Sequence, residues 1–226
     1  MSRRTGLFGG TFDPIHFGHL FLAQAAADAF SLDRVLFWPS PDPYHRANMH
    51  ISPLSDRINM TKLAILDNAR FEFSSFETEL PGPVFTSSTL ESFHREYPDD
   101  ELYFIMGGDS LFSIEFWKDP EKIFSLATIL SGKRSGQSRG ASGILHPGPD
   151  GRAKEKKEET EGEDKDLDKK ISELKERFSA RIYNIHVPEI EISSSDIKER
   201  VRNGRSIKYY TPDKVAEYIY EKRLYI

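Results

Sequence analysis

The chain has 226 residues, about one and a half times a typical domain, so it can form one large domain or two small ones. Its 31 Lys and Arg residues against 36 Asp and Glu residues give a net charge of −5, which excludes a chain built mainly to coat nucleic acid. There is no cysteine, so disulfides and thiolate-ligated metal sites are excluded, and the composition fits a reducing compartment. No apolar run approaches the ~20 residues that span a bilayer. We therefore expect a cytoplasmic protein with no signal peptide and no membrane partner.

Short apolar runs alternate with helical patterns along the chain. Such alternation predicts βαβ units, and hence an α/β fold with an open parallel sheet, helices on both faces and a small helical part at the C-terminal end. The last helix is expected to open with the cap residue Thr211 followed by Pro212. We expect strands at 6–9, 34–38, 102–106, 126–130 and 182–187 with an edge strand at 72–76, and helices at 18–30, 55–66, 86–97, 194–202 and 212–222.

Residues 133–178 interrupt this alternation. Within them, 15 of the 19 residues at 152–170 are charged, seven basic and eight acidic. Such a segment cannot bury enough apolar surface to offset the entropy lost on ordering, so we expect a flexible, exposed charged insertion, either a solvated spacer or a partner-binding arm. Apolar residues at three- and four-residue steps predict a helix over its last part, 167–178. We expect the rest of 1–226 to form a single domain around it.

The loop after the first strand has the strongest chemical signal. Residues 9–19 read Gly-Gly-Thr-Phe-Asp-Pro-Ile-His-Phe-Gly-His. Glycines directly after a strand let a ligand approach the backbone. A helix that begins near Gly18 turns its free N–H groups and its dipole toward the same place, which suits a phosphate. His16 and His19 can both donate hydrogen bonds to phosphate oxygens, although an ordinary glycine turn with two surface histidines is the simpler alternative.

Taken together, residues 9–19 resemble the signature of the HxGH nucleotidylyltransferases, with His16 to His19 as the tetrad. The resemblance narrows to the nicotinate-nucleotide adenylyltransferases and covers about 6–131 and 182 to the end. Two positions depart from that family's pattern, because Lys198 stands where arginine is usual and Ser88 where Asp is frequent. The further segments that are similar are Pro43-Tyr44-His45-Arg46, 85–90, 107–111, Trp117 and 192–198.

The resemblance implies a Rossmann-like fold and the transfer of the adenylyl group of ATP to nicotinate mononucleotide. The products would be deamido-NAD (nicotinate adenine dinucleotide) and pyrophosphate, in NAD biosynthesis. Mg²⁺ would arrive with ATP, held mainly by phosphates and water, so no protein metal ligands are expected. The resemblance makes His16 and His19 catalytic, assigns ATP binding to Gly9, Gly10, Thr11, Phe12, Ser193, Ser194 and Lys198, and assigns acceptor binding to His45, Arg46, Thr86, Asp109 and Trp117.

Several alternatives remain open from the sequence. The acceptor could be nicotinamide mononucleotide, phosphopantetheine or a sugar or polyol phosphate, and the chain could be a non-catalytic nucleotide-binding module. Because lysine lacks the bidentate fork of arginine, Arg200 or Arg202 could supply the triphosphate contact in place of Lys198. Gly136 to Gly140 match a serine-hydrolase pattern, but no amphipathic helix follows them, so that reading is disfavoured. No nucleic-acid partner is expected, and the sequence is compatible with a homo-oligomer.

Overall fold

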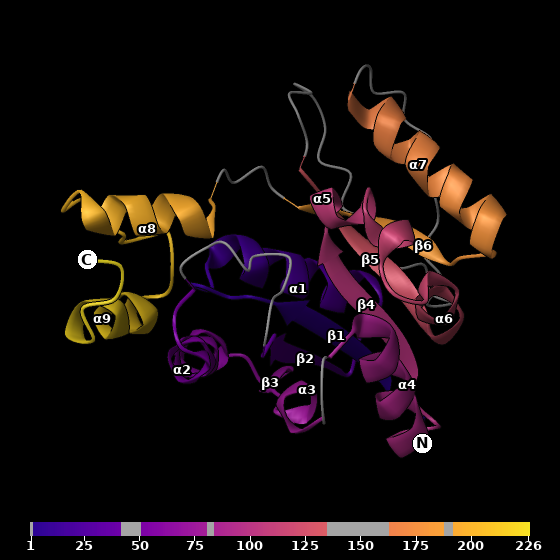
Figure 1. Cartoon of the computed structure of the whole chain (residues 1–226), viewed down its shortest axis with the longest axis horizontal. Coiled ribbons are helices and arrows are strands. Elements are labelled where there is room, and N and C mark those ends of the chain that lie inside the picture. Colours follow the sequence, from indigo (N-terminus) through magenta and orange to yellow (C-terminus); the bar gives the residue numbers. More distant parts are fainter. Residues whose placement is uncertain (1, 42–50, 81–83, 135–162, 188–191) are drawn as a thin grey trace. The chain divides into compact units, whose positions relative to one another are not determined.

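The computed structural model of the chain describes residues 2–41, 51–80, 84–134, 163–187 and 192–226. Its six strands form one sheet in the order β3-β2-β1-β4-β5-β6 (Figure 1). The pairs β1–β4, β4–β5 and β5–β6 are parallel, with Leu7 opposite Phe104 and Ile105 opposite Leu130. This order is that of a Rossmann-like fold, so the predicted fold class is confirmed. The strands are β1 (Arg4–Gly10), β2 (Arg34–Pro39), β3 (Phe71–Phe73), β4 (Glu101–Gly107), β5 (Ala127–Arg134) and β6 (Ile182–Val187).

The helices agree with the sequence predictions at the longer elements and add short ones. The short helices α3, α5 and α6 were not predicted, because segments of four to seven residues carry little periodicity. The predicted edge strand is confirmed at the sheet edge but ends at Phe73. The helices are α1 (Phe17–Ala29), α2 (Leu54–Ile65), α3 (Phe76–Glu79), α4 (Thr86–Glu96), α5 (Gly108–Leu111), the 3₁₀ helix η2 (Ile114–Phe116), α6 (Pro120–Leu126), α7 (Glu163–Phe178), α8 (Ser194–Arg202) and α9 (Asp213–Glu221).

The predicted start of the last helix is wrong in one respect. Pro212 itself stands at the N-cap of α9, and no side chain caps the helix there. The hydroxyl of Thr211 instead donates a hydrogen bond of 2.7 Å to the backbone carbonyl of Ile15. A threonine that sequence spacing predicts as a cap therefore serves a contact with a residue far away in the chain.

The chain divides into two compact units. The first comprises Met1–Phe8, Leu22–Val35 and Phe85–Glu189. Its centre is β4, in which every residue from Leu102 to Met106 is buried, as expected for a strand covered on both faces. A side chain at Gly132 would place its Cβ 2.7 Å from Leu22, so glycine at this position of β5 allows α1 to pack closely.

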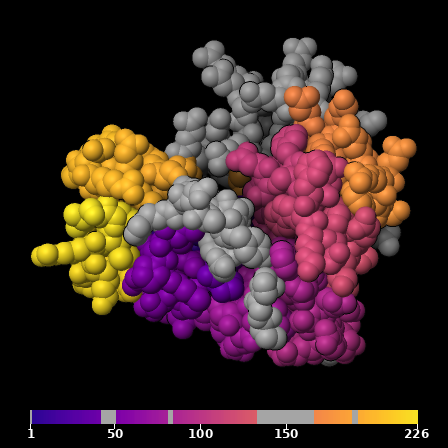
Figure 2. All heavy atoms as spheres, viewed as in Figure 1, coloured from indigo at the N-terminus to yellow at the C-terminus, as the bar shows by residue number. Residues whose placement is uncertain are grey.

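Helix α7 packs on this first unit and confirms the helix predicted at 167–178. Its apolar face is buried through Leu167, Ile171 and Leu174, and Phe178 stacks on Phe124 of α6 with 4.9 Å between ring centroids. Figure 2 shows the orange atoms of α7 against the rose atoms of the preceding segment. The edges of the predicted insertion are thus strand β5 and helix α7, while 135–162 lie outside the described residues. The flexibility of the insertion stays a prediction, as does the single domain.

The second unit comprises Gly9–Phe21, Leu36–Val84 and Ile190–Ile226. In it, α2 packs against α9, and the hydroxyl of Tyr218 on α9 donates to Asp56 of α2 at 2.8 Å. The same hydroxyl accepts a hydrogen bond of 3.0 Å from Asn59. Among the described residues, no helix has the length and apolar character that crossing a membrane requires.

Candidate active site

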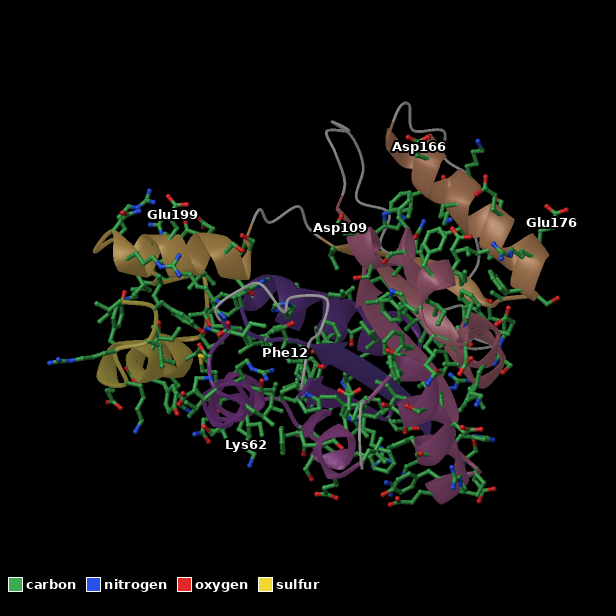
Figure 3. The ribbon with its side chains drawn as sticks, viewed as in Figure 1. Phe12, Lys62, Asp109, Asp166, Glu176 and Glu199 are labelled. Carbon is green, nitrogen blue, oxygen red and sulfur yellow. The ribbon has the colours of Figure 1, made fainter. Side chains whose placement is uncertain are left out.

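The loop that follows β1 turns sharply at Phe12, which Figure 3 labels. Phe12 has a φ of 48° and is 2% exposed, and its ring covers Gly10. A Cβ on Gly10 would lie 2.8 Å from that ring, so only glycine permits this packing. The carbonyl of Gly10 accepts a hydrogen bond of 2.9 Å from the backbone N–H of Ser40. The result is a backbone-lined floor directly at the carboxyl end of a strand, where ligands of open α/β sheets usually bind.

His16 and His19 lie together at the start of α1. Their rings are stacked with 3.7 Å between centroids, and the carbonyl of His16 accepts the first helical hydrogen bond from the N–H of His19 at 3.0 Å. The N–H of His16 donates to Nδ1 of His19 at 3.2 Å. Because Nδ1 accepts, the proton of the neutral His19 ring lies on Nε2, which is then a donor. A helix N-terminus and two imidazoles at one place form a site suited to a phosphate.

Helix α8 brings its N-terminus to the same loop. Ser193 caps the helix by accepting a hydrogen bond of 3.0 Å from the N–H of Asp196, as its position predicts. The hydroxyl of Ser194 donates to the carbonyl of Pro14 at 2.9 Å. The second unit therefore gathers every residue predicted to be catalytic or to bind ATP, namely Gly9, Gly10, Thr11, Phe12, His16, His19, Ser193, Ser194 and Lys198.

The ammonium group of Lys198 lies in a largely buried position on α8. It bonds to the carboxylate of Asp13, and its side chain is 12% exposed. The ammonium also lies 5.1 Å from the ring centroid of Tyr225. The alternative cation Arg200 donates to the carbonyl of Ser206 at 2.9 Å and stacks on Tyr210. The structure thus ties Lys198 to the loop after β1 and ties Arg200 to the segment after α8.

Asp13 is the centre of a buried polar cluster that sequence reasoning missed. Its carboxylate is 1% exposed and accepts hydrogen bonds from Lys198, from the hydroxyl of Tyr225 at 2.7 Å and from the N–H of Ser52 at 3.2 Å. Burial raises the pKa of Asp13, but the hydrogen bonds from Lys198, Tyr225 and Ser52 outweigh it and hold the pKa below its usual value. Asp13 is therefore a carboxylate at neutral pH.

Arg57 is a second residue that the sequence analysis did not identify. It is 2% exposed on α2, and its guanidinium donates to the carbonyls of Thr11 at 2.9 Å, Ser40 at 2.8 Å and Ser52 at 3.1 Å. A fourth, longer bond of 3.4 Å reaches Pro41. Burial lowers the pKa of Arg57, and the nearby negative charge of Asp13 acts in the opposite direction. One buried cation thus joins the loops that follow β1 and β2, and an arginine in an amphipathic helix gives no sequence signal for this role.

The residues predicted to bind the acceptor lie in the first unit or outside the described residues. Thr86 is the first residue of α4, and Asp109 is exposed on α5 (Figure 3). Trp117 follows η2, and its indole N–H donates to the hydroxyl of Ser113 at 3.3 Å. The predicted His45 and Arg46 lie outside the described residues.

Ser88, which stands where the family frequently has Asp, hydrogen-bonds to the start of its own helix α4. The hydroxyl of Ser88 accepts from the N–H of Phe85 at 3.2 Å and donates to its carbonyl at 2.8 Å, so Ser88 supports the first turn of the helix. The ammonium of Lys118 lies 4.4 Å from the ring centroid of Phe85. This contact places the start of α4 beside the segment that contains Trp117.

No group of three or more His, Asp or Glu side chains that could hold a metal ion occurs within the part of the chain that the structure describes. Any cation at this site would be held mainly by the phosphates it accompanies.

The sequence matches the model of the family described as cytidylyltransferase-like over residues 7–200. The chain belongs to this family. A relative from Lachnoclostridium phytofermentans named probable nicotinate-nucleotide adenylyltransferase is 36% identical over 99% of this chain and 100% of its own length. A relative of the same name from Dehalococcoides mccartyi is also 36% identical, over 100% of this chain and 98% of its own. The predicted resemblance to nicotinate-nucleotide adenylyltransferases is thus confirmed, and it extends beyond the predicted ranges 6–131 and 182–226, because the alignments cover 99% and 100% of the chain.

Two solved structures of proteins with adenylyltransferase names agree with the fold. The nicotinic acid mononucleotide adenylyltransferase of Plasmodium falciparum, in a complex with NaAD, matches with a TM-score of 0.71 over 99% of this chain and 97% of that one. A putative nicotinate-nucleotide adenylyltransferase from Vibrio parahaemolyticus matches with a TM-score of 0.62 over 99% and 95%. Their sequence identities of 18% and 20% mean that these matches establish the fold alone.

Proposed function

We propose that the chain transfers the adenylyl group of ATP to nicotinate mononucleotide, giving deamido-NAD and pyrophosphate in NAD biosynthesis. The observation that carries this proposal is the stacked pair His16 and His19 at the start of α1, in a chain that is 36% identical over its full length to relatives named for this reaction. The chain is accordingly a nucleotidyltransferase. The composition without cysteine supports a reducing compartment, and we place the reaction in the cytoplasm.

The chemistry requires positioning and charge stabilisation more than covalent help. A phosphate oxygen of the acceptor attacks the α-phosphorus of ATP, the bond from that phosphorus to the bridging oxygen breaks, and pyrophosphate leaves. His19 donates through Nε2–H to a phosphate oxygen, since its Nδ1 already accepts a hydrogen bond from His16. The N–H groups at the start of α1 add their dipole, so negative charge that develops in the transition state meets donors already in place.

The remaining binding roles follow from position. Gly9, Gly10, Thr11 and Phe12 form the backbone floor under ATP, and Ser193 and Ser194 present the N-terminus of α8 to its phosphates. Lys198 is assigned to the ATP phosphates as the predicted cation on α8, where its ammonium also pairs with Asp13 beside this floor. On the acceptor side, we assign Thr86, Asp109 and Trp117, with Trp117 stacking on the pyridine ring and Thr86 meeting its carboxylate. His45 and Arg46, outside the described residues, are assigned to the acceptor's phosphate.

Mg²⁺ fits this site as a companion of ATP. A small hard cation of this kind would keep most of its water and would need few protein ligands. It would neutralise the charge of the leaving pyrophosphate. The residues of the chain would hold the phosphates themselves.

The test is an acceptor panel with the purified chain, ATP and Mg²⁺, followed by pyrophosphate release. We expect the highest kcat/KM with nicotinate mononucleotide. A preference for nicotinamide mononucleotide or phosphopantetheine would refute the acceptor. Absence of pyrophosphate release with every acceptor would refute the proposed enzymatic activity and favour a non-catalytic nucleotide-binding module.

The histidine role is tested by His19→Ala. We expect kcat to fall by about 10²- to 10³-fold, the effect of removing one donor to developing charge, with ATP binding within about tenfold. His94→Ala, at an exposed histidine on α4, is the matched control and should keep the activity of the unmodified chain. Equal turnover in the two variants would contradict a catalytic role for His19.

A further inference from the structure

The loop from Asp13 to Phe17 is held by residues that come 180 to 212 positions later in the sequence. The carbonyl of Pro14 accepts from Ser194 at 2.9 Å. The carbonyl of Ile15 accepts from Thr211 at 2.7 Å. The N–H of Phe17 donates to the carbonyl of Tyr210 at 3.1 Å, and Asp13 accepts from Tyr225 at 2.7 Å. Each residue of this loop other than His16 is therefore tied to the segment 194–225, and His16 lies between the tied residues.

Tyr225 makes the contact at the start of this loop. Its hydroxyl donates a hydrogen bond to Oδ1 of Asp13, while Lys198 and the N–H of Ser52 both donate to Oδ2. Its ring lies under the ammonium of Lys198, with 5.1 Å from the nitrogen to the ring centroid. One tyrosine thus contacts both members of a buried ion pair.

The backbone supports the idea that this contact is specific. Tyr225 has a φ of 68°, in the left-handed region that residues other than glycine rarely adopt. Such a conformation persists where surrounding contacts over-determine it. Burial and the neighbouring charge of Asp13 raise the pKa of the Tyr225 hydroxyl, so it remains a donor at neutral pH.

We propose that Tyr225 is a positioning residue for adenylyl transfer: it orients the carboxylate of Asp13, and through Asp13 it fixes both Lys198 and the loop that carries His16 and His19. This inference rests on the proposed function. Without the hydroxyl, Oδ1 of a 1% exposed carboxylate loses its donor. The carboxylate then turns toward its remaining partners, and the start of the histidine loop moves with it.

Tyr225→Phe tests this, because it removes the hydroxyl and keeps the ring under Lys198. Tyr218→Phe is the matched control, since Tyr218 also donates to a carboxylate, Asp56 at 2.8 Å, in the same unit. We expect kcat of Tyr225→Phe to fall about tenfold with KM for the acceptor within about twofold, as for a small misplacement of reacting groups. Tyr218→Phe should change kcat by less than about twofold, even if its melting temperature falls by as much as that of Tyr225→Phe.

A second pair of measurements separates positioning from loss of structure. In an Asp13→Asn background, Tyr225→Phe should lower kcat little further, because both substitutions disrupt the same contacts from Tyr225 through Asp13 to the histidine loop. In ¹⁵N spectra of histidine side chains, assigned with His16→Gln and His19→Gln, Tyr225→Phe should shift both imidazoles and Tyr218→Phe should shift neither. The spectra need no turnover, so they decide the inference even if no acceptor is adenylylated. Identical kcat and identical imidazole shifts in the two tyrosine variants would overturn it.

Discussion

Gly18→Ala is expected to separate stability from activity in this protein. A Cβ on Gly18 would lie 3.0 Å from Nδ1 and 3.1 Å from Cε1 of His16. Because carbon contacts are comfortable from about 3.5 Å, the His16 ring must move by roughly half an ångström. His16 is 7% exposed, and its ring is stacked on that of His19 with 3.7 Å between centroids, so the ring cannot move without disturbing its partner.

The size of both effects follows from this geometry. Alanine favours a helix over glycine by up to about 1 kcal/mol, and Gly18 lies in the first turn of α1. We therefore expect the free energy of unfolding to stay within about 1 kcal/mol of that of the unmodified chain. A misplacement of 1 Å can cost about a hundredfold in rate, so half of that distance predicts about a tenfold fall in kcat. This corresponds to about 1.4 kcal/mol in the barrier.

The assay combines steady-state pyrophosphate release with thermal unfolding. Gly18→Val, with two further methyl groups toward the same ring, should lose at least as much activity as Gly18→Ala. Unchanged kcat in Gly18→Ala would refute the reasoning, because the His16 ring would then have freedom that its burial and stacking do not allow. A large loss of stability would refute it as well.

Three further changes test the buried cluster and the packed helix α7. Arg57→Met removes the Arg57 donor from four backbone carbonyls and should cost about 3–5 kcal/mol in urea unfolding, and a loss below about 1 kcal/mol would contradict its role. The pKa of Asp13 lies below its usual 3.8 in the folded chain, so its charge stabilises the fold above that pH and loses this effect as the pH falls through the lowered pKa. Asp13→Asn should therefore be less stable than the unmodified chain at pH 7, and its melting temperature should fall less steeply below pH 3.8. Parallel curves of melting temperature against pH for the two proteins would refute this. Glu115→Gln weakens the contacts with Lys170 and Arg177 and should speed amide hydrogen exchange in α7. Unchanged exchange protection in α7 would contradict the role of Glu115 in holding this helix.

The sequence by itself determined the features that local spacing encodes. Short apolar runs bounded by loops gave the strands of a parallel sheet, since a strand buried on both faces carries apolar residues without alternation. The loop that we propose to bind phosphate lies within the contiguous residues 9–19, so its glycines and histidines are visible as one pattern. The cap of α8 by Ser193 is also local, because a cap bonds to an N–H only three residues away.

The tertiary structure alone decided the partners of the polar side chains around that loop. Thr211 bonds to Ile15, 196 residues away, instead of capping α9. Lys198 reaches Asp13 across 185 residues, and Tyr225 reaches the same carboxylate across 212. A hydrogen bond needs its two atoms within about 3 Å, and no periodicity in the sequence states which distant residue will come that close. The local pattern of residues 9–19 thus predicts a phosphate site, whereas the tertiary structure alone shows which distant buried groups bond to that loop.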